Sequence, residues 1–274
     1  MKKLKRLEPQ ISNLFEKFRI IVTESKAEAR QVVIEQMSNF DVFVACGGDG
    51  TIQFLASELI GTEKLLGVLP LGSGNDFAKV LTTNHTIHNY LQILLNGIPK
   101  SYDLIKVNES SFFINTFGIG FDGLANSIAG NNKWMPGRIK YAYSAIKSLL
   151  DVTPVNAIIK TESSTYEIDF SYMLVLSNGR WEGGSFLISP KSVPNDGILE
   201  LTVSTSDSKL KLAKQLFRLL LGKHLEPHEV KLISLTSASI SLNEAVVAHA
   251  DGEIIKPANE FHFELIPNGV TLLA

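Results

Sequence analysis

Apolar positions in the first hundred residues alternate between strand-like and helix-like spacing. Three short apolar runs are typical of buried strands: FRIIVTES at 18–25, DVFVACG at 41–47 and KLLGVLPLG at 64–72. Helical spacing follows each run, at 26–39, at 51–61 and from residue 75. Because strands that alternate with helices form parallel sheets covered on both faces, we expect an α/β domain over residues 1–101.

Beyond residue 101 the apolar runs are short, rich in β-branched and aromatic residues, and bounded by Gly, Asn, Pro and Ser. They lie at 101–108, 110–121, 156–161, 165–179, 197–205, 229–243 and 261–274. Two stretches with helical spacing interrupt them, GRIKYAYSAIKSLLD at 137–151 and SKLKLAKQLFRLLLGKH at 208–224. We therefore expect a β-rich second domain over residues 102–274.

Composition narrows the classes of function that the chain can have. Apolar residues make up 45% of the 274 residues and charged residues 20%, which is an ordinary globular composition. A formal net charge of −2 disfavours nucleic acid as a partner held by bulk basicity. No window reaches the ~18 uninterrupted apolar residues of a membrane span, and no apolar signal-peptide run follows the basic start. We expect a cytoplasmic protein.

Cysteine and histidine usage gives little support for a metal cluster. The single cysteine, Cys46, excludes an intrachain disulfide framework, which fits a reducing cytosol. We interpret Cys46 as a small core residue rather than a reactive thiol. The pairs His85/His88 and His224/His228 lack a third ligand at a recognised zinc spacing, so a zinc site is disfavoured.

Two glycine-rich turns follow predicted strands, GGDGT at 47–51 and PLGSGND at 70–76. A glycine turn between a strand and a helix start exposes backbone N–H groups and the positive end of the helix dipole, which together bind phosphate. In parallel sheets, ligands bind beyond the carboxyl ends of the strands, where both turns fall. Neither turn matches a dinucleotide or P-loop fingerprint, so a simple tight turn is the alternative interpretation.

The aspartates in these turns indicate a particular chemistry. A carboxylate among phosphate-directed amides repels phosphate unless it holds magnesium or takes a proton from a hydroxyl nucleophile. Both roles belong to phosphoryl transfer. Asp49 fits this interpretation, and Asp76 fits it equally, with a helix N-cap as the alternative for Asp76.

Together the turns resemble a known family. GGDGT followed by PLGSGNDFAK is similar to the catalytic domain of diacylglycerol kinases, sphingosine kinases and related bacterial lipid kinases. NTFGIGFD, SNGRWEGGSFLISP, VPNDGILEL and ADGE resemble later blocks of this family in the same order, so the resemblance spans about residues 19–273. It implies an N-terminal α/β domain like that of phosphofructokinases and NAD kinases, a C-terminal β-sandwich domain, and ATP in the cleft between them.

The resemblance also implies which residues bind ATP and magnesium. The implied nucleotide contacts are Thr23, Gly47, Gly48, Asp49, Gly50, Thr51, Ile52, Gln53, Gly72, Ser73, Gly74, Asn75 and Asp76. A structural Mg²⁺ would take the carboxylate of Asp196 and the carbonyls of Val193 and Ile198, with water linking the metal to Asp49 and Asp76. Without the resemblance, PNDG is a strong turn sequence.

The implied activity is an ATP- and magnesium-dependent transfer of the γ-phosphoryl group to a lipid hydroxyl, with diacylglycerol-like lipids as the leading acceptor. This places the chain in phospholipid metabolism. The resemblance carries the general base over to Glu253, while Asp49 is the competing candidate and Asp251 has only the role of a turn former.

A lipid substrate implies transient contact with the inner membrane face, and a homodimer is compatible with the family. The stretch 208–224 has a basic amphipathic pattern, with Lys211, Lys214 and Arg218 opposite Leu212, Ala213, Leu216, Phe217 and Leu220. A core helix with a solvated basic face explains the same pattern without a membrane.

Two features depart from the family. The chain starts with a helix-like stretch where members have a strand and an N-P-x-S-G turn, so the first strand and one phosphate loop are expected to be missing. GGDGT is followed by Gln53 and Phe54, where members often have Asn and Glu. A non-catalytic or weakly active lipid- or nucleotide-binding relative is therefore the alternative function, and a soluble NAD- or sugar-kinase-like activity is a further one.

Overall fold

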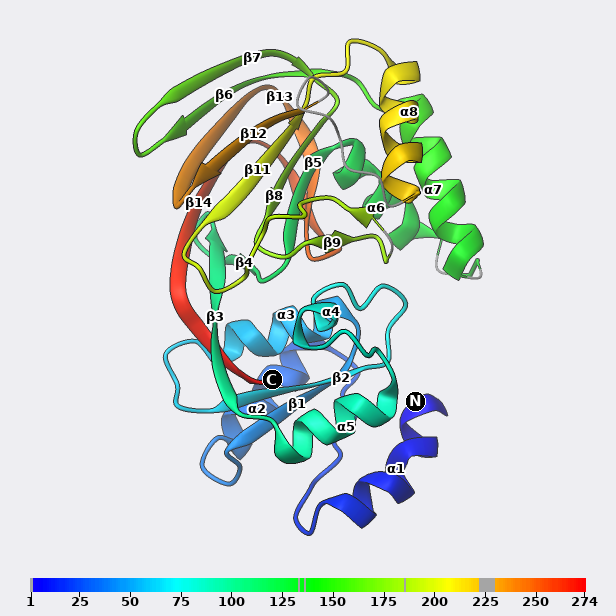
Figure 1. The fold of residues 1–274 in the computed structure, drawn as a ribbon, viewed down its shortest axis with the longest axis vertical. Coiled ribbons are helices and arrows are strands. Elements are labelled where there is room, and N and C mark those ends of the chain that lie inside the picture. Colours follow the sequence, from blue (N-terminus) through cyan, green and yellow to red (C-terminus); the bar gives the residue numbers. More distant parts are fainter. Residues whose placement is uncertain (1, 133, 136, 185, 222–229) are drawn as a thin grey trace. The chain divides into compact units, whose positions relative to one another are not determined.

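The computed structural model describes all residues except 1, 133, 136, 185 and 222–229, and the chain folds into two compact units (Figure 1). The first unit comprises Met1–Tyr102 and Asn268–Ala274, and the second comprises Asp103–Pro267. The sequence pattern assigns residues 102–274 to one domain and gives no sign that the C-terminal residues return to the first unit.

The first unit combines a small parallel sheet with helices. Its helices are α1 (Lys2–Leu14), α2 (Lys26–Gln36), α3 (Asp49–Glu58), α4 (Ala78–Leu81) and α5 (Ile87–Asn96). Its strands are β1 (Val42–Gly47) and β2 (Leu65–Pro70), which pair in parallel. The end of β14 (Glu253–Leu273) adds a third parallel strand, with Thr271 opposite Leu65. The predicted α/β class is confirmed.

The strand predicted at residues 18–25 is wrong. This stretch forms no strand, and Phe18, Ile21 and Val22 are exposed. An apolar run becomes a strand only where it pairs and packs against neighbours, and the ladder that β1 forms among the described residues is the one with β2. The interpretation of Cys46 as a core residue is also wrong, because its side chain is exposed on β1.

The second unit is β-rich, as predicted, and its strands are mainly antiparallel. They are β3 (Pro99–Val107, which starts in the first unit), β4 (Ser111–Phe113), β5 (Thr116–Gly120), β6 (Val155–Thr161), β7 (Thr165–Ser171), β8 (Met173–Ser177), β9 (Trp181–Glu182), β10 (Phe186–Leu187), β11 (Leu199–Ser204), β12 (Val230–Leu235), β13 (Ser237–Ala250) and most of β14. The main sheet runs β14–β13–β5–β8–β11–β12, and β6 and β7 extend it from β13. Phe113, Phe117, Phe261 and Phe263 pack edge to face or stacked in its core.

Three helices lie together on one side of this sheet (Figure 1): α6 (Phe121–Asn131), α7 (Gly137–Asp151) and α8 (Lys209–Leu220). Helices α7 and α8 confirm the two predicted helical stretches, although residues 222–224 of the second stretch lie outside the described residues. The sequence pattern did not reveal α6. Buried apolar residues from the helices and the sheet, among them Phe121, Met173, Leu212 and Leu219, form a second core cluster.

Candidate functional site

The two glycine turns of the first unit touch each other. The carbonyl of Gly47 accepts hydrogen bonds from the amides of Leu71 and Gly72, at 2.8 and 3.2 Å. Gly48 is the N-cap of α3 and, having no side chain, makes no side-chain hydrogen bond to the first amides of the helix. A Cβ at Gly72 would lie 2.5 Å from the Cα of Gly48, so this approach requires glycine. The structure therefore brings together the two turns that the sequence assigned to phosphate.

Asp49 and Asp76 lie within this pair of turns. Asp49 Oδ1 accepts the amide of Phe77 at 3.1 Å, and Asp76 Oδ1 forms an ion pair with Lys79 at 2.6 Å. Burial, followed by the charge of Asp76, raises the pKa of Asp49 to about 6, although neighbouring backbone amides lower it. A carboxylate with this pKa exchanges protons near neutral pH, which suits a general base.

The other predicted nucleotide residues differ in exposure. Thr51 and Ser73 are exposed, whereas Ile52 and Gln53 are buried in α3. Gly50, Gly74 and Asn75 are half-buried. Ile52 can therefore reach a ligand only through its backbone. Thr23 is half-buried in the stretch that was predicted to be a strand, and the cap of α2 is the neighbouring Ser25.

The predicted magnesium ligands belong to a tight turn of the second unit. Asp196 is exposed, and its Oδ1 accepts the amide of Ile198 at 3.0 Å. The buried Asp103 stabilises the turn, because its Oδ2 accepts a hydrogen bond from the amide of Gly197 at 2.8 Å. One carboxylate and the carbonyls of Val193 and Ile198 are oxygen donors of the kind that hard cations take. The site fits magnesium in chemistry, and the metal stays a prediction.

The predicted base, Glu253, follows a two-residue hairpin turn. Asp251 and Gly252 have positive φ angles of 49° and 81°, and Ala250 pairs with Glu253 across the turn. Positive φ at both central positions is typical of the type I′ hairpin, whose twist matches that of the flanking strands. Glu253 thus lies half-buried at the first position of β14.

Asp251 does more than form this turn, which corrects the role expected from the sequence. Its buried carboxylate accepts the backbone amides of Ile114, Asn115 and Thr116 at 2.8, 3.0 and 2.9 Å. Asp251 therefore anchors the hairpin that bears Glu253 to the start of β5.

Sequence reasoning also missed a buried cluster in the second unit. His249 Nε2 lies 2.7 Å from Asp122 Oδ2 and 2.9 Å from Glu182 Oε1. Gly118 leaves room for the cluster, since a Cβ at this position would collide with the Asp122 carboxylate and the imidazole. Burial, followed by the charge of Asp122, raises the pKa of Glu182 to about 8. Glu182 therefore holds a proton at neutral pH beside Asp122, whose carboxylate can accept a hydrogen bond from it.

The tautomer of His249 decides between a metal site and a shared proton. The amide of Gly252 donates to Nδ1 at 3.1 Å, so Nδ1 carries a lone pair and the ring proton is on Nε2. Burial lowers the pKa of His249 and the two carboxylates raise it, with a net increase; the donated amide nevertheless favours the neutral ring. A metal would need the lone pair of Nε2. The geometry favours a hydrogen-bonded, proton-sharing cluster.

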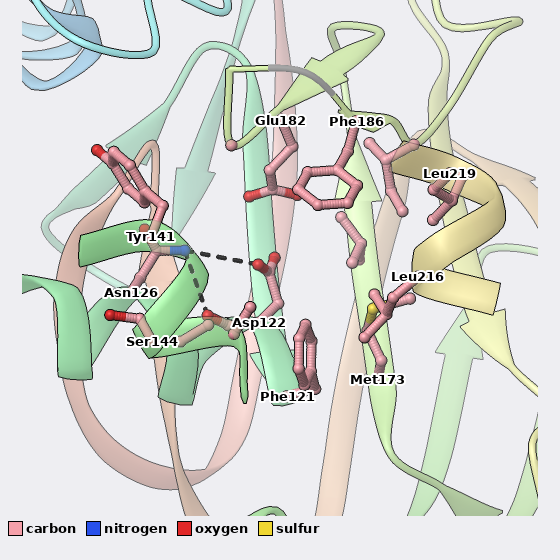
Figure 2. Close-up of a pocket in the computed structure, with 15 residues that line it drawn as sticks. Phe121, Asp122, Asn126, Tyr141, Ser144, Met173, Glu182, Phe186, Leu216 and Leu219 are labelled. Carbon is pink, nitrogen blue, oxygen red and sulfur yellow. Dashed lines mark hydrogen bonds between the residues drawn. The ribbon is translucent and has the colours of Figure 1, made fainter. Parts of the chain in front are cut away.

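This cluster lies at the polar end of an apolar pocket (Figure 2). Asp122 and Glu182 face the pocket beside Phe186, and Asn126 donates hydrogen bonds to Asp122. The wall is mainly apolar and comes from α6, α7, α8, β8 and the β9–β10 hairpin; it includes Phe121, Met173, Val175, Ile188, Leu216 and Leu219. The pocket therefore combines a mainly apolar wall with two carboxyl groups at one end.

We expect Glu182 to make stability depend on pH. Its pKa in the folded state, about 8, lies above the ordinary 4.5, so between these values the folded chain keeps a proton that the unfolded chain has lost. The stabilising effect is complete below about pH 4.5 and is lost as the pH rises toward 8, at up to about 1.4 kcal/mol per pH unit. Urea unfolding at several pH values should show this slope in the wild type and a flatter one in Glu182→Gln.

Glu167→Gln serves as the control, because Glu167 is exposed on β7. It should keep the slope of the wild type. Equal slopes for the wild type and Glu182→Gln would show that Glu182 is ionised in the folded protein.

The members of the cluster come from blocks whose resemblance to the family is visible in the sequence: GIGFD, RWEGG and AHADGE. Asp122 and His249 are 127 positions apart, and no local spacing links them. The only signal was a set of acidic residues and a histidine inside blocks that already matched the family in order.

Comparisons with known proteins agree in both units. Residues 1–107 match the family described as the diacylglycerol kinase catalytic domain, and residues 115–274 match the YegS C-terminal NAD kinase beta sandwich-like domain. A diacylglycerol kinase of Mycobacterium tuberculosis is 27% identical over 223 residues, covering 79% of this chain and 72% of that protein. The probable lipid kinase YegS-like protein of Citrobacter koseri is 28% identical over 255 residues, covering 91% and 83%.

The fold is also found in a solved structure. The crystal structure of a diacylglycerol kinase from Bacillus anthracis superposes with a TM-score of 0.75 at 20% identity, covering 98% of this chain and 90% of that one. At this identity the likeness supports the fold alone. Among the residues that the structure describes, no helix has both the length and the apolar character needed to cross a bilayer.

Proposed function

Because the chain belongs to the family of diacylglycerol-kinase-like lipid kinases, with the YegS-type C-terminal domain, we propose that it transfers the γ-phosphoryl group of ATP to a hydroxyl of a diacylglycerol-like lipid. The observation that carries this proposal is the contact between the two glycine turns, with Asp49 and Asp76 inside them. Glycines allow backbone amides to approach phosphate oxygens closely, and the N-terminus of α3 adds its dipole.

Phosphoryl transfer requires a base, a binding site for the phosphates of ATP and neutralisation of the phosphate charge. We call the two glycine turns, residues 47–51 and 70–76, the phosphate cradle. A base takes the proton of the lipid hydroxyl, the hydroxyl oxygen forms a bond to the γ-phosphorus, and the bond from that phosphorus to the leaving oxygen of ADP breaks. Glu253 is the proposed base, since it follows the hairpin turn that Asp251 anchors to the start of β5. Asp49 is the alternative base, supported by its pKa of about 6. Magnesium, when bound, would neutralise phosphate charge. Asp49 and Asp76 are the carboxylates of the first unit proposed to hold it or its waters, and Asp196 is the carboxylate proposed for a metal in the second unit.

The pocket of the second unit supports a lipid acceptor. Its wall is apolar enough to take part of an acyl chain, and Asp122 and Glu182 offer hydrogen-bond partners at one end. Protonated Glu182 can donate a hydrogen bond and Asp122 can accept one. We propose that this pocket holds the lipid next to its polar group.

A phosphorylation assay with radiolabelled ATP and magnesium tests the function. A panel of diacylglycerol, monoacylglycerol, ceramide, sphingosine and phosphatidylglycerol should yield a labelled product, with diacylglycerol the leading candidate. Calorimetric binding of ATP without transfer to any lipid would instead support the non-catalytic relative. Transfer to a sugar or to NAD would overturn the lipid proposal.

Substitution of one glycine tests the cradle. We expect Gly72→Ala to weaken ATP binding at least about tenfold, because the new Cβ pushes the two turns apart where Gly48 and Gly72 touch. Calorimetry and the KM for ATP measure this. Gly130→Ala is the control: Gly130 lies in α6 with open space around it, so this variant should bind ATP like the wild type. Equal ATP affinity in both variants would contradict the role of the cradle.

A further inference from the structure

Helix α7 presents apolar residues on its solvent side. Ile139, Tyr143, Ile146 and Leu150 follow one another at helical spacing and are 41% to 66% exposed. The inner face buries Ser144 and Ser148 beside Ala145 and Leu149, which pack against the apolar core cluster of the second unit. A surface helix normally turns its apolar face to the core and its polar face to water. Helix α7 therefore has an apolar stripe on its outer side in addition to the apolar residues that face the core, which indicates that the outer side meets an apolar environment.

The serines of α7 explain how its inner face tolerates burial. The hydroxyl of Ser144 donates to the carbonyl of Lys140 at 2.8 Å, and that of Ser148 donates to the carbonyl of Phe121 at 2.6 Å. Both buried hydroxyls are thus satisfied. The inner side of α7 is thus packed with its polar groups satisfied, and the stripe of Ile139, Tyr143, Ile146 and Leu150 lies on the outer side.

Helix α8 has a second outward stripe with the same spacing. Leu210, Lys214, Phe217 and Leu221 face out, and the three apolar members are 57% to 82% exposed. The sequence pattern placed Phe217 opposite Lys214; in the structure both lie on the exposed face, and Leu212 and Leu219 are buried.

The two helices pack side by side (Figure 1), and Trp134, 79% exposed, lies just before α7. We call the two stripes together the α7–α8 face. Tryptophan is enriched where proteins meet the headgroup region of a membrane.

The basic residues of helix α8 indicate the kind of surface that the α7–α8 face binds. Helix α8 carries Lys209, Lys211, Lys214 and Arg218 and no acidic residue, in a chain whose formal net charge is −2. Basic residues beside an apolar stripe complement anionic lipid headgroups. A second copy of the same basic face would be repelled, which disfavours self-association through it.

We propose that the α7–α8 face docks on the surface of an anionic bilayer. This inference rests on the proposed lipid kinase function. The same two helices wall the pocket, through Tyr141 and Ala145 of α7 and Leu216 and Leu219 of α8. Docking therefore places the lipid source next to the elements that enclose the acceptor site, so the substrate need not cross water.

Vesicle flotation tests the docking surface. The probes are phosphatidylcholine vesicles with and without about one third phosphatidylglycerol, the anionic component that a basic face should select. The wild type should float with the anionic vesicles, and the double variant Ile146→Glu/Phe217→Glu should bind them at least about tenfold less, because each change removes an apolar contact and adds a repelled charge. Ile158→Glu/Leu232→Glu is the matched control, since both residues are exposed on β6 and β12.

Further measurements separate this proposal from its alternatives. Equal flotation of the two double variants would overturn it, as would a wild-type dimer in analytical ultracentrifugation that only Ile146→Glu/Phe217→Glu dissociates. Short-chain diacylglycerol in detergent micelles bypasses the bilayer, so both variants should phosphorylate it at the wild-type rate while the first loses activity on vesicles. A wild type that floats but phosphorylates no lipid would support docking and remove the proposed function.

Discussion

Replacing Glu253 with glutamine is expected to lower kcat for lipid phosphorylation by about 10²- to 10⁴-fold, the usual contribution of a positioned general base. Glutamine keeps the size of the side chain but cannot take a proton. The hairpin should be unaffected, because Asp251 and Gly252 hold its shape. ATP affinity, measured by calorimetry, should therefore stay close to that of the wild type. The measurement is the rate at saturating ATP and lipid.

Glu260→Gln is the matched control, because Glu260 is exposed on the same strand. It should leave kcat unchanged. Undiminished turnover in Glu253→Gln would remove Glu253 as the base and favour Asp49. In that case the acid limb of the pH–rate profile should break near pH 6, where Asp49 titrates, and Asp49→Asn should abolish the reaction.

Replacing Asp251 with alanine is expected to destabilise the fold by more than about 3 kcal/mol. Three backbone amides, those of Ile114, Asn115 and Thr116, would lose their shared acceptor, and each buried unsatisfied group costs about 1–3 kcal/mol. Alanine also tolerates the positive φ of this position poorly. Urea unfolding followed by circular dichroism measures the loss.

Two further variants test whether the loss of stability in Asp251→Ala comes from the missing carboxylate acceptor. Asp251→Asn keeps one acceptor oxygen and a residue type that adopts positive φ, so its loss should be smaller than that of alanine. Asp169→Ala, at an exposed position of β7, should change stability little. A loss below about 1 kcal/mol in Asp251→Ala would mean that other groups or water replace the carboxylate.

The alternation of apolar runs predicted both classes of domain because it reflects burial. Residues 42–47 and 65–70 became parallel strands, and α7 and α8 formed where helical spacing was visible. The strand predicted at residues 18–25 does not form, because a strand needs a neighbouring strand to pair with and the local sequence carries no information about such a partner. Helix α6 was missed since Gly123 and Gly130 weaken its helical signal, and tertiary contacts with β5 and β13 override that weakness.

The candidate site also has a part that the sequence predicted, the glycine turns, and a part that it did not, the buried cluster of Asp122, Glu182 and His249. The glycine turns carry a local signature and each follows directly from its own strand, so the sequence located them. Asp122 lies in α6, Glu182 in β9 and His249 near the end of β13. These residues come together only through the tertiary fold, so no local pattern could predict their contact. Asp103 and Asp251 looked like ordinary acidic residues because their amide partners are set by the tertiary fold.

The return of residues 268–274 to the first unit has a consequence for synthesis of the chain. The second unit is continuous in sequence, so it can fold as soon as Pro267 has left the ribosome. The parallel sheet of the first unit is complete only when Thr271 and Leu272 reach β2. The strand that leads into the second glycine turn therefore gains its last neighbour only after the whole second unit has been synthesised, so the first unit completes its fold after the second.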